Sequence, residues 1–366
     1  MARKRFSFPQ LAFFSGADRW LVILPLTLSL FGLLLIFDAS AVAALHDFND
    51  KFHFFRQQSI WLILGIFLFF LCSQLNYRFW KKIALPFFLV NLFFLVLVLI
   101  PGLGKQIYGG RRWLQFGFFG FQPAELTKLS LTFYLATLFE KKRDFLPFLV
   151  VTGVLLLLLL LEPDFGTAVI ISATAFAIYF LAGAPWGQII LVGLLAAVGA
   201  PLLILFSPYR RQRLLTFFNS SFDVQGASYH LRQILIALGS GGIWGRGLGQ
   251  SRQKFLFLPE VTTDSIFAVI AEELGFFGAT ILILALFFLV YRIFRLAILS
   301  KDPFGKMLVA GIGFFLGLQI IINLGAMVAL FPLTGIPLPF ISYGGSSLLV
   351  LLAGMGIVYN VSKNKY

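Results

Sequence analysis

Ten apolar segments, each near the length of a membrane span, divide this chain of 366 residues. A helix needs about 20 residues to cross a hydrocarbon core of ~30 Å. Because 59% of the residues are hydrophobic, only 12% are charged and the mean hydropathy is +0.93, the composition excludes a soluble globular protein. We predict an all-α polytopic membrane protein, residues 1–366 forming a single integral membrane domain with about ten transmembrane helices. These are expected near residues 20–43, 58–76, 83–101, 123–140, 145–161, 165–183, 188–206, 265–291, 307–331 and 346–361.

The distribution of lysine and arginine predicts the orientation of these helices. The first segment is too long for a signal-peptide core and lacks a small-residue cleavage site, so we expect it to be retained. An even number of spans places both termini on one side, and basic residues concentrate in the arm 1–19, the tail 362–366 and the connections on that side. We therefore predict cytoplasmic termini and one large extracytoplasmic loop, residues 207–263, between the seventh and eighth helices.

The net charge of +14 is mostly this topology signal, spread over short turns, and we expect no nucleic-acid partner. The loop 207–263 is different, because it carries seven basic residues and only two acidic ones, Asp223 and Glu260. That balance favours an anionic ligand at the outer surface or attraction to acidic lipid headgroups. The basic residues of the loop are Arg210, Arg211, Arg213, Arg232, Arg246, Arg252 and Lys254.

Several kinds of site are excluded or weakly supported. Cys72 is the single cysteine, so no internal disulfide forms, and no Cys/His spacing typical of a zinc site is present. The chain has no phosphate loop of the G-x-x-x-x-G-K-[ST] type, which argues against direct use of ATP. The glycine-rich run 239–249 follows no buried strand, so a Rossmann site is disfavoured. It is either a flexible turn or a tight loop whose N–H groups and Arg246 approach a phosphate.

The predicted topology places the remaining polar segments at the extracytoplasmic ends of the helices. Residues 332–346 contain three prolines and three glycines and cannot form a continuous helix. Irregular backbone at membrane depth survives only where protein buries it or water reaches it. We therefore predict an outward-facing polar cavity near this segment, 110–113, 122–128, 162–164 and Asp264.

Acidic residues in and beside apolar helices need a partner, water or a substrate, yet each has a structural alternative. Asp264 follows two threonines and precedes a helix, which is also the pattern of an N-cap. Glu125 and Lys128 are spaced as an ion pair, and Asp164 is placed to start the sixth helix. We expect structural roles for Glu272 and Glu273.

At these residues the chain resembles the SEDS family of bacterial shape, elongation, division and sporulation proteins, which polymerise lipid II into glycan strands. The resemblance spans most of the chain, and the stretch 247–254 is closer to the division and sporulation branch (FtsW-like) than to the elongation branch (RodA-like). The chain departs from the family pattern at Ala124, at Val261 and Thr262, at Ser265 and at His230, where glutamine is frequent. The matching stretches are 110–113, 122–128, 163–168, 239–254, 258–275 and 332–347.

The resemblance implies an inverting glycosyltransferase of the bacterial cytoplasmic membrane that joins lipid II to the growing glycan strand, with polyprenyl pyrophosphate as leaving group. Asp264 matches the family's essential aspartate and is expected to act as general base or as ligand of Mg²⁺ or Mn²⁺. Because a helix N-terminus lowers a carboxylate's pKa, we favour the metal ligand. Expected substrate-binding residues are Arg111, Arg112, Lys128, Arg246, Arg252, Lys254 and Ser342, supported by Glu125, Asp164, Glu260 and Glu273.

The implied partners are a class B penicillin-binding protein, which would supply transpeptidase activity, and other membrane proteins of the division or elongation machinery. Two other functions are open from the residues alone. The polar cavity could belong to a transporter that flips the lipid-linked precursor, although no internal repeat is visible. The chain could also be a scaffold for division proteins, in which Asp264 is only a cap.

Overall fold

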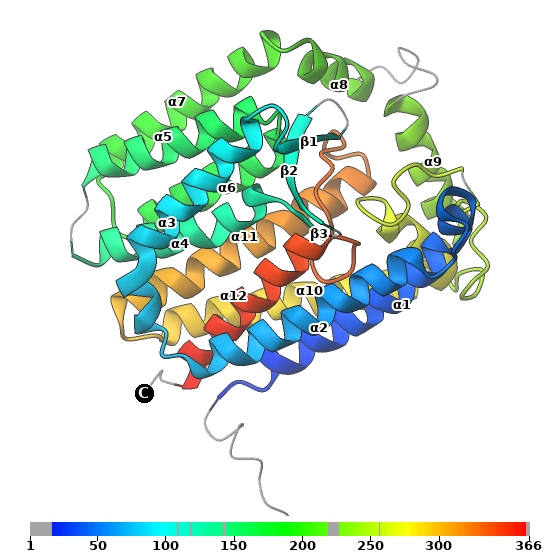
Figure 1. Cartoon of the computed structure of the whole chain (residues 1–366), viewed down its shortest axis with the longest axis horizontal. Helices are drawn as coiled ribbons and strands as arrows, with labels where there is room; N and C mark the ends of the chain where they lie inside the picture. Colours follow the sequence, from blue (N-terminus) through cyan, green and yellow to red (C-terminus); the bar gives the residue numbers. More distant parts are fainter. Residues whose placement is uncertain are drawn as a thin grey trace, which may run out of the picture.

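The computed structural model describes residues 17–107, 110–117, 119–141, 144–218, 227–255 and 257–363 (Figure 1). Each of the ten predicted segments coincides with a helix, and several helices extend past the apolar stretch into polar residues. The helices are α1 (Trp20–Phe48), α2 (His53–Gln74), α3 (Arg78–Leu99), α4 (Pro123–Lys141), α5 (Phe145–Leu161), α6 (Phe165–Leu181), α7 (Trp186–Leu205), α10 (Ile266–Leu299), α11 (Pro303–Met327) and α12 (Gly345–Lys363).

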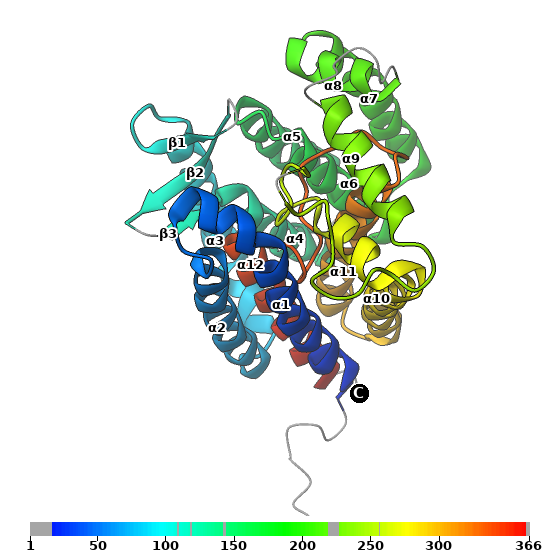
Figure 2. The same cartoon turned by 90° about the vertical axis from the view of Figure 1, so that its right-hand side faces the viewer.

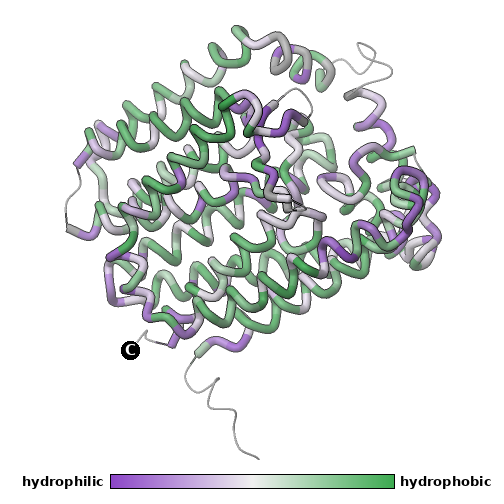
Figure 3. The backbone as a smooth tube through the Cα atoms, viewed as in Figure 1, coloured by the Kyte–Doolittle hydropathy of each residue, from purple (hydrophilic) through white to green (hydrophobic). Residues whose placement is uncertain are grey.

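By length and composition, seven of these helices can cross a membrane, namely α1, α2, α3, α7, α10, α11 and α12. The apolar helices α5 and α6 have 17 residues each, and α4 carries charged residues near both ends. Hydrophobic residues fill the middle of the bundle and hydrophilic ones gather towards its two ends (Figure 3). The protein is thus an all-helical polytopic membrane protein in its spanning part, as predicted.

Two helices form the centre of the bundle and one lies apart from it. In the most apolar window of α12, 89% of the residues are buried, and in α11 78%, whereas none is buried in α7. The helix α2 packs along α12, and α10 packs along α11 (Figure 1). Burial of apolar side chains around α11 and α12 therefore fixes the position of the segment that joins them, residues 328–344.

A three-stranded sheet and two further helices were not expected from the sequence. The connection between α3 and α4 forms an antiparallel sheet of β1 (Gly104–Ile107), β2 (Gly110–Phe116) and β3 (Phe119–Phe121). The predicted loop 207–263 contains two helices, α8 (Pro208–Phe218) and α9 (Ala227–Ser240). The sheet and these two helices lie at the same end of the bundle, which faces the viewer in Figure 2. There the sheet lies on one side, α8 and α9 lie on the other, and the segment between α11 and α12 lies between them.

The helix α10 is broken at Gly275, whose φ of 66° and ψ of −168° are not helical. The glycine-rich loop forms hydrogen bonds with the backbone groups that this break leaves without helical partners. The N–H groups of Phe276 and Phe277 donate to the carbonyls of Gly242 and Ile243, at 2.9 and 3.3 Å. In return, the carbonyls of Glu272 and Glu273 each accept a loop N–H at 3.0 Å. The loop is not a flexible turn, because its N–H groups and carbonyls complete the backbone hydrogen bonds that the break in α10 leaves open. The N–H groups of Arg246 and Gly247 are used in these bonds and are not available to a phosphate.

Close approach explains why this loop needs glycine. At Gly245 φ is +80°, and an added Cβ would lie 2.1 Å from the carbonyl oxygen of Glu273. We expect Gly245→Ala to destabilise the protein by roughly 1–3 kcal/mol from backbone strain alone, seen as a lower thermal midpoint in detergent. Gly193→Ala in α7 is the control, because its Cβ meets nothing within 4 Å and alanine favours a helix. Equal midpoints for the two variants would contradict this account of the loop.

Candidate functional site

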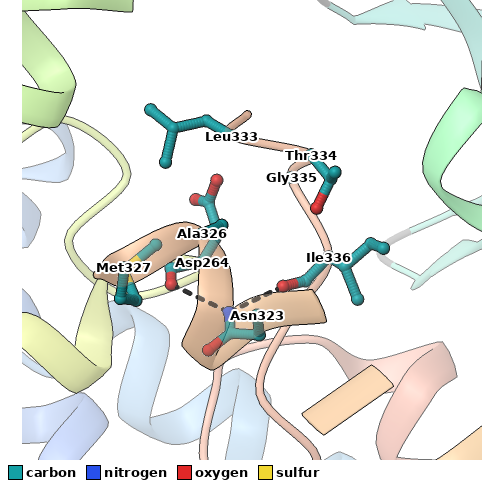
Figure 4. Close-up of a pocket in the computed structure, with 8 residues that line it drawn as sticks. All are labelled: Asp264, Asn323, Ala326, Met327, Leu333, Thr334, Gly335 and Ile336. Carbon is teal, nitrogen blue, oxygen red and sulfur yellow. Dashed lines mark hydrogen bonds between the residues drawn. The ribbon is translucent and has the colours of Figure 1, made fainter. Parts of the chain in front are cut away.

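Asp264 lines a narrow, partly open pocket at the end of the bundle that carries the sheet, α8 and α9 (Figure 4). The pocket is bounded by the end of the long loop, by α11 and by the segment that follows α11. Its lining residues are Asp264, Asn323, Ala326, Met327, Leu333, Thr334, Gly335 and Ile336.

The backbone around Asp264 is held by side chains and backbone from other elements. The Asn323 side-chain amide donates to the carbonyls of Asp264 and Ile336, at 3.0 and 2.8 Å (Figure 4). The N–H of Tyr343 donates to the carbonyl of Thr262 at 2.8 Å. These bonds join the end of the loop to α11 and to the irregular segment after it, so the position of Asp264 is fixed by parts of the chain that are distant in sequence.

Asp264 does not cap α10. The residue at the N-cap position is Ser265, and no side chain there accepts a hydrogen bond from the first turn. The Asp264 carboxylate instead lies 3.1 Å from the hydroxyl of Thr263, which also lies 2.8 Å from a carboxylate oxygen of Glu260. The capping alternative for Asp264 is therefore wrong, and one hydroxyl bridges two carboxylates beside the pocket.

Burial and a like charge raise the pKa of Asp264. Its side chain is almost fully buried, which disfavours the ionised form, and the nearby Glu260 carboxylate acts in the same direction. The Arg213 guanidinium acts against them, and the resulting pKa is about 6. The prediction of a lowered pKa is wrong, because the carboxylate does not cap the helix and is shielded from water.

Arg213 of α8 is a site residue that the sequence analysis did not single out. Its guanidinium donates to the carbonyl of Leu333 at 2.8 Å, and its charge lowers the pKa of Asp264. Within the loop it is one basic residue among several, and no spacing in the sequence marks it. Only the packing of α8 over the end of the bundle brings it to the pocket.

The predicted pair Glu125 and Lys128 is buried in α4 and supports the irregular segment. The Lys128 ammonium lies 2.8 and 2.9 Å from the two Glu125 oxygens and 3.0 Å from the Gln319 side-chain oxygen. Gln319 in turn donates to the carbonyl of Pro337 at 3.0 Å. Ser342 accepts a hydrogen bond from the N–H of Leu338 at 2.8 Å and closes a turn of the same segment.

Arg112 and Asp164 connect the sheet to the turn between α5 and α6. The Arg112 guanidinium donates to the carbonyls of Glu162 and Pro163, and Asp164 caps α6 by accepting from the N–H of Thr167 at 3.1 Å. Asp164 thus starts the sixth helix, as one alternative predicted. The neighbouring Arg111 of β2 is partly exposed.

A second ionic cluster ties the glycine-rich loop to α1 and α10. The Lys254 ammonium lies 2.8 Å from Asp38 and 2.9 Å from Glu273. Glu272 accepts from the hydroxyl of Ser251, and its carboxylate lies 3.6 Å from Arg246. The backbone N–H of Arg252 also donates to Glu272, while the Arg252 side chain is exposed. Both glutamates therefore have the structural role that we expected.

The structure thus distributes the predicted residues over separate places. Asp264 and Glu260 lie together beside Arg213. Lys128 and Glu125 support the irregular segment, to which Ser342 belongs, whereas Lys254, Arg246 and Glu273 hold the loop. The described part of the chain assembles no group of three or more His, Cys, Asp or Glu side chains that could hold a metal ion.

Comparison with known proteins agrees with the resemblance seen in the sequence. Residues 18–366 match the family model of FtsW, RodA and SpoVE, described as cell cycle protein. A probable peptidoglycan glycosyltransferase FtsW of Geobacter sulfurreducens is 38% identical, covering 94% of this chain and 95% of that protein. FtsW of Coxiella burnetii, also a probable peptidoglycan glycosyltransferase, is 41% identical, covering 94% and 96%. Stage V sporulation protein E of Bacillus subtilis is 38% identical, covering 95% and 98%.

Two solved structures share the fold. One is a chain from a structure of a peptidoglycan synthase complex that coordinates polymerization and crosslinking. It has a TM-score of 0.78 and 31% identity, and the match covers 96% of this chain and 98% of that one. The other is the rod shape determining protein RodA of Thermus thermophilus, with a TM-score of 0.71, 31% identity, and coverage of 96% and 99%. The chain therefore belongs to the SEDS family of FtsW, RodA and SpoVE proteins and is a multi-pass membrane protein.

Proposed function

We propose that this protein is a peptidoglycan glycosyltransferase that polymerises lipid II at the outer face of the bacterial cytoplasmic membrane. The observation that carries the proposal is the buried, non-capping carboxylate of Asp264 in a pocket at one end of the bundle. The names of the relatives support the activity. In this proposal the end with α8 and α9 faces outward and both termini are cytoplasmic, as the distribution of basic residues predicts.

In the proposed reaction, the 4-hydroxyl of the acceptor sugar attacks the anomeric carbon of the donor. A C–O bond forms with inversion, the bond to the pyrophosphate breaks, and the hydroxyl proton passes to a base. We assign Asp264 as that base, because a carboxylate with a pKa of about 6 is mostly ionised at neutral pH yet more basic than an ordinary aspartate. The polyprenyl pyrophosphate leaves with the bonding electron pair.

Arg213 is our first candidate for the pyrophosphate contact, because its guanidinium lies by the pocket and suits the bidentate geometry of phosphate. Arg111 and Arg252, whose side chains are partly or fully exposed, are further candidates. Several residues that the sequence assigned to substrate already bond protein groups, and we propose that they hold the site's walls in place. They are Arg112, Lys128, Arg246, Lys254 and Ser342.

The Mg²⁺ or Mn²⁺ ion that the resemblance implies fits the chemistry of the donors. The Thr263 hydroxyl is shared between the carboxylates of Glu260 and Asp264, so two like charges lie close together and present oxygen atoms. Mg²⁺ is commonly bound by one or two carboxylates together with substrate phosphates. We propose this as the alternative to the role of base: Glu260 and Asp264 would hold the ion with the substrate's pyrophosphate, where it would offset charge on the leaving group.

As partner we propose a class B penicillin-binding protein, together with other membrane proteins of the division or elongation machinery. The solved relative that forms part of a peptidoglycan synthase complex supports this kind of assembly. The names FtsW and stage V sporulation protein E among the relatives support the division and sporulation branch.

Asp264→Asn should abolish polymerisation, because an amide cannot accept the acceptor's proton. We expect activity on labelled lipid II to fall by at least 10²-fold in proteoliposomes with the transpeptidase partner present. The matched control is Asp302→Asn, because Asp302 is an N-cap of α11, with its carboxylate 2.9 Å from the N–H of Gly305, and asparagine caps equally well. Glycan strands made by folded Asp264→Asn would contradict the role. Transbilayer movement of the lipid without any polymer would favour the transporter.

The pH profile should report the raised pKa of Asp264. A base acts when deprotonated, so kcat/KM should fall as pH drops through about 6 rather than near the ordinary value of 3.8. Glu260→Gln should move the inflection to lower pH, because Glu260 raises this pKa, and Arg213→Gln should move it to higher pH. A bound divalent cation would keep the carboxylate ionised and move the inflection well below 6. An inflection that neither variant shifts would contradict the assignment of Asp264 as the titrating group.

Removal of divalent cations tests the metal proposal separately. If Asp264 holds the ion, treatment with a chelator should abolish polymerisation, and Mg²⁺ or Mn²⁺ added in excess should restore it. Glu260→Gln should raise the Mg²⁺ concentration needed for half-maximal activity, because one of two carboxylate ligands is lost. Full activity in chelator-treated protein would rule out the ion and leave the role of Asp264 as base untouched.

A further inference from the structure

His230 of α9 contacts the residue that follows Asp264. Its Nε2 lies 2.6 Å from the hydroxyl oxygen of Ser265. A serine at an N-cap usually accepts a hydrogen bond from the first turn of its own helix. At α10 no side chain makes that bond, and the Ser265 hydroxyl meets the imidazole of α9 instead. This contact therefore joins α9 to the start of α10, next to the proposed catalytic carboxylate.

The same imidazole also reaches the other end of the turn that carries Asp264. It also lies near the backbone of Pro259, whose carbonyl acts to raise the pKa of the imidazole. Pro259 and Ser265 bracket the turn of residues 260–264, which supplies Glu260, Thr263 and Asp264. One side chain thus contacts the residue after Asp264 and lies near the residue before Glu260.

The turn needs external support, because its own backbone is strained and weakly bonded. Glu260 has a φ of 50°, in the left-handed region that non-glycine residues rarely adopt. Within the turn, the N–H groups of Thr263 and Ser265 reach the Glu260 carbonyl at 3.2 and 3.3 Å, near the long limit for such bonds. A strained conformation of this kind persists only where the surroundings enforce it.

The protonation state of His230 suits a clamp. Burial lowers its pKa to about 4, so the imidazole is neutral near pH 7. A neutral imidazole offers one donor and one acceptor, and either can pair with the Ser265 hydroxyl. A glutamine amide offers the same pair of groups, so it is the conservative replacement here.

We propose that His230 is a positioning residue for the polymerisation reaction, which clamps the start of α10 through Ser265 and so holds the Asp264 carboxylate in its reactive orientation. The inference rests on the proposed function and deepens it. His230 touches neither substrate nor reacting atoms in this role. Its effect should therefore appear in the rate of the chemical step and not in substrate binding.

The test is a double-mutant cycle on the full-length protein in proteoliposomes with its partner and labelled lipid II. We expect His230→Ala to lower kcat by roughly 10- to 100-fold, because small misplacement of a catalytic group costs this much, with KM within about twofold. Ser265→Ala should lower kcat in the same direction. The double variant should be no worse than His230→Ala, because the two residues share one contact. His230→Gln should keep most of the activity.

Leu235→Ala is the control on the same helix, because the Leu235 side chain is 45% exposed and contributes nothing to the turn. It should leave kcat unchanged and should match His230→Ala in thermal midpoint. Hydrogen exchange supplies a readout that needs no activity. The peptide that covers residues 257–266 should exchange faster in His230→Ala and Ser265→Ala than in wild type or Leu235→Ala.

Unchanged kcat in folded His230→Ala, losses that add in the double variant, or a rise in KM alone would each overturn the proposal. So would a His230→Gln variant as impaired as His230→Ala. Wild-type protein that makes no glycan would instead count against the proposed function. In that case the exchange of the 257–266 peptide would still decide whether His230 clamps the turn, so the two failures are distinguishable.

Discussion

The Asn323 side-chain amide is the interaction on which the candidate site most depends. Its two N–H groups bind the carbonyls of Asp264 and Ile336, which belong to irregular segments about 70 residues apart in the sequence. An unsatisfied backbone group in an apolar environment costs several kcal/mol, so these two bonds stabilise both segments. Because α11 is largely buried, it presents Asn323 from a fixed position. The pocket therefore forms between three segments that the same residue aligns.

The buried charges serve the same purpose at two other places. Lys128 and Glu125 hold Gln319, which binds the segment after α11. Lys254 joins Asp38 to Glu273 and fixes the glycine-rich loop over the break in α10. A charge in a membrane protein needs a partner, and in these clusters the partners also order backbone that is not helical. Resemblance to enzymes draws attention to such residues as substrate ligands, although their contacts are with the protein itself.

The sequence predicts the helices well because their signal is local. Apolar stretches mark the ten helices that were predicted, and the prolines and glycines of 332–346 correctly predict a broken segment. The role of Asp264 as a non-capping residue is not visible, because the pattern Thr-Thr-Asp before a helix is also that of a cap. Arg213, Asn323 and His230 reach the site through tertiary packing alone. The role of the glycine-rich loop was not predicted either, because its hydrogen-bond partner is the break in α10 at Gly275. No residue near the loop in the sequence indicates that contact.

The central claim is that the acceptor hydroxyl is deprotonated by Asp264 in the pocket beside α11. The most direct measurement is a structure of the protein in lipid nanodiscs with a non-reactive lipid II analogue and a short glycan acceptor. The account predicts the acceptor 4-hydroxyl within about 2.6–3.2 Å of an Asp264 carboxylate oxygen, with the pyrophosphate next to Arg213. An acceptor hydroxyl bound well beyond hydrogen-bond reach of Asp264, or a substrate at the opposite end of the bundle, would contradict it.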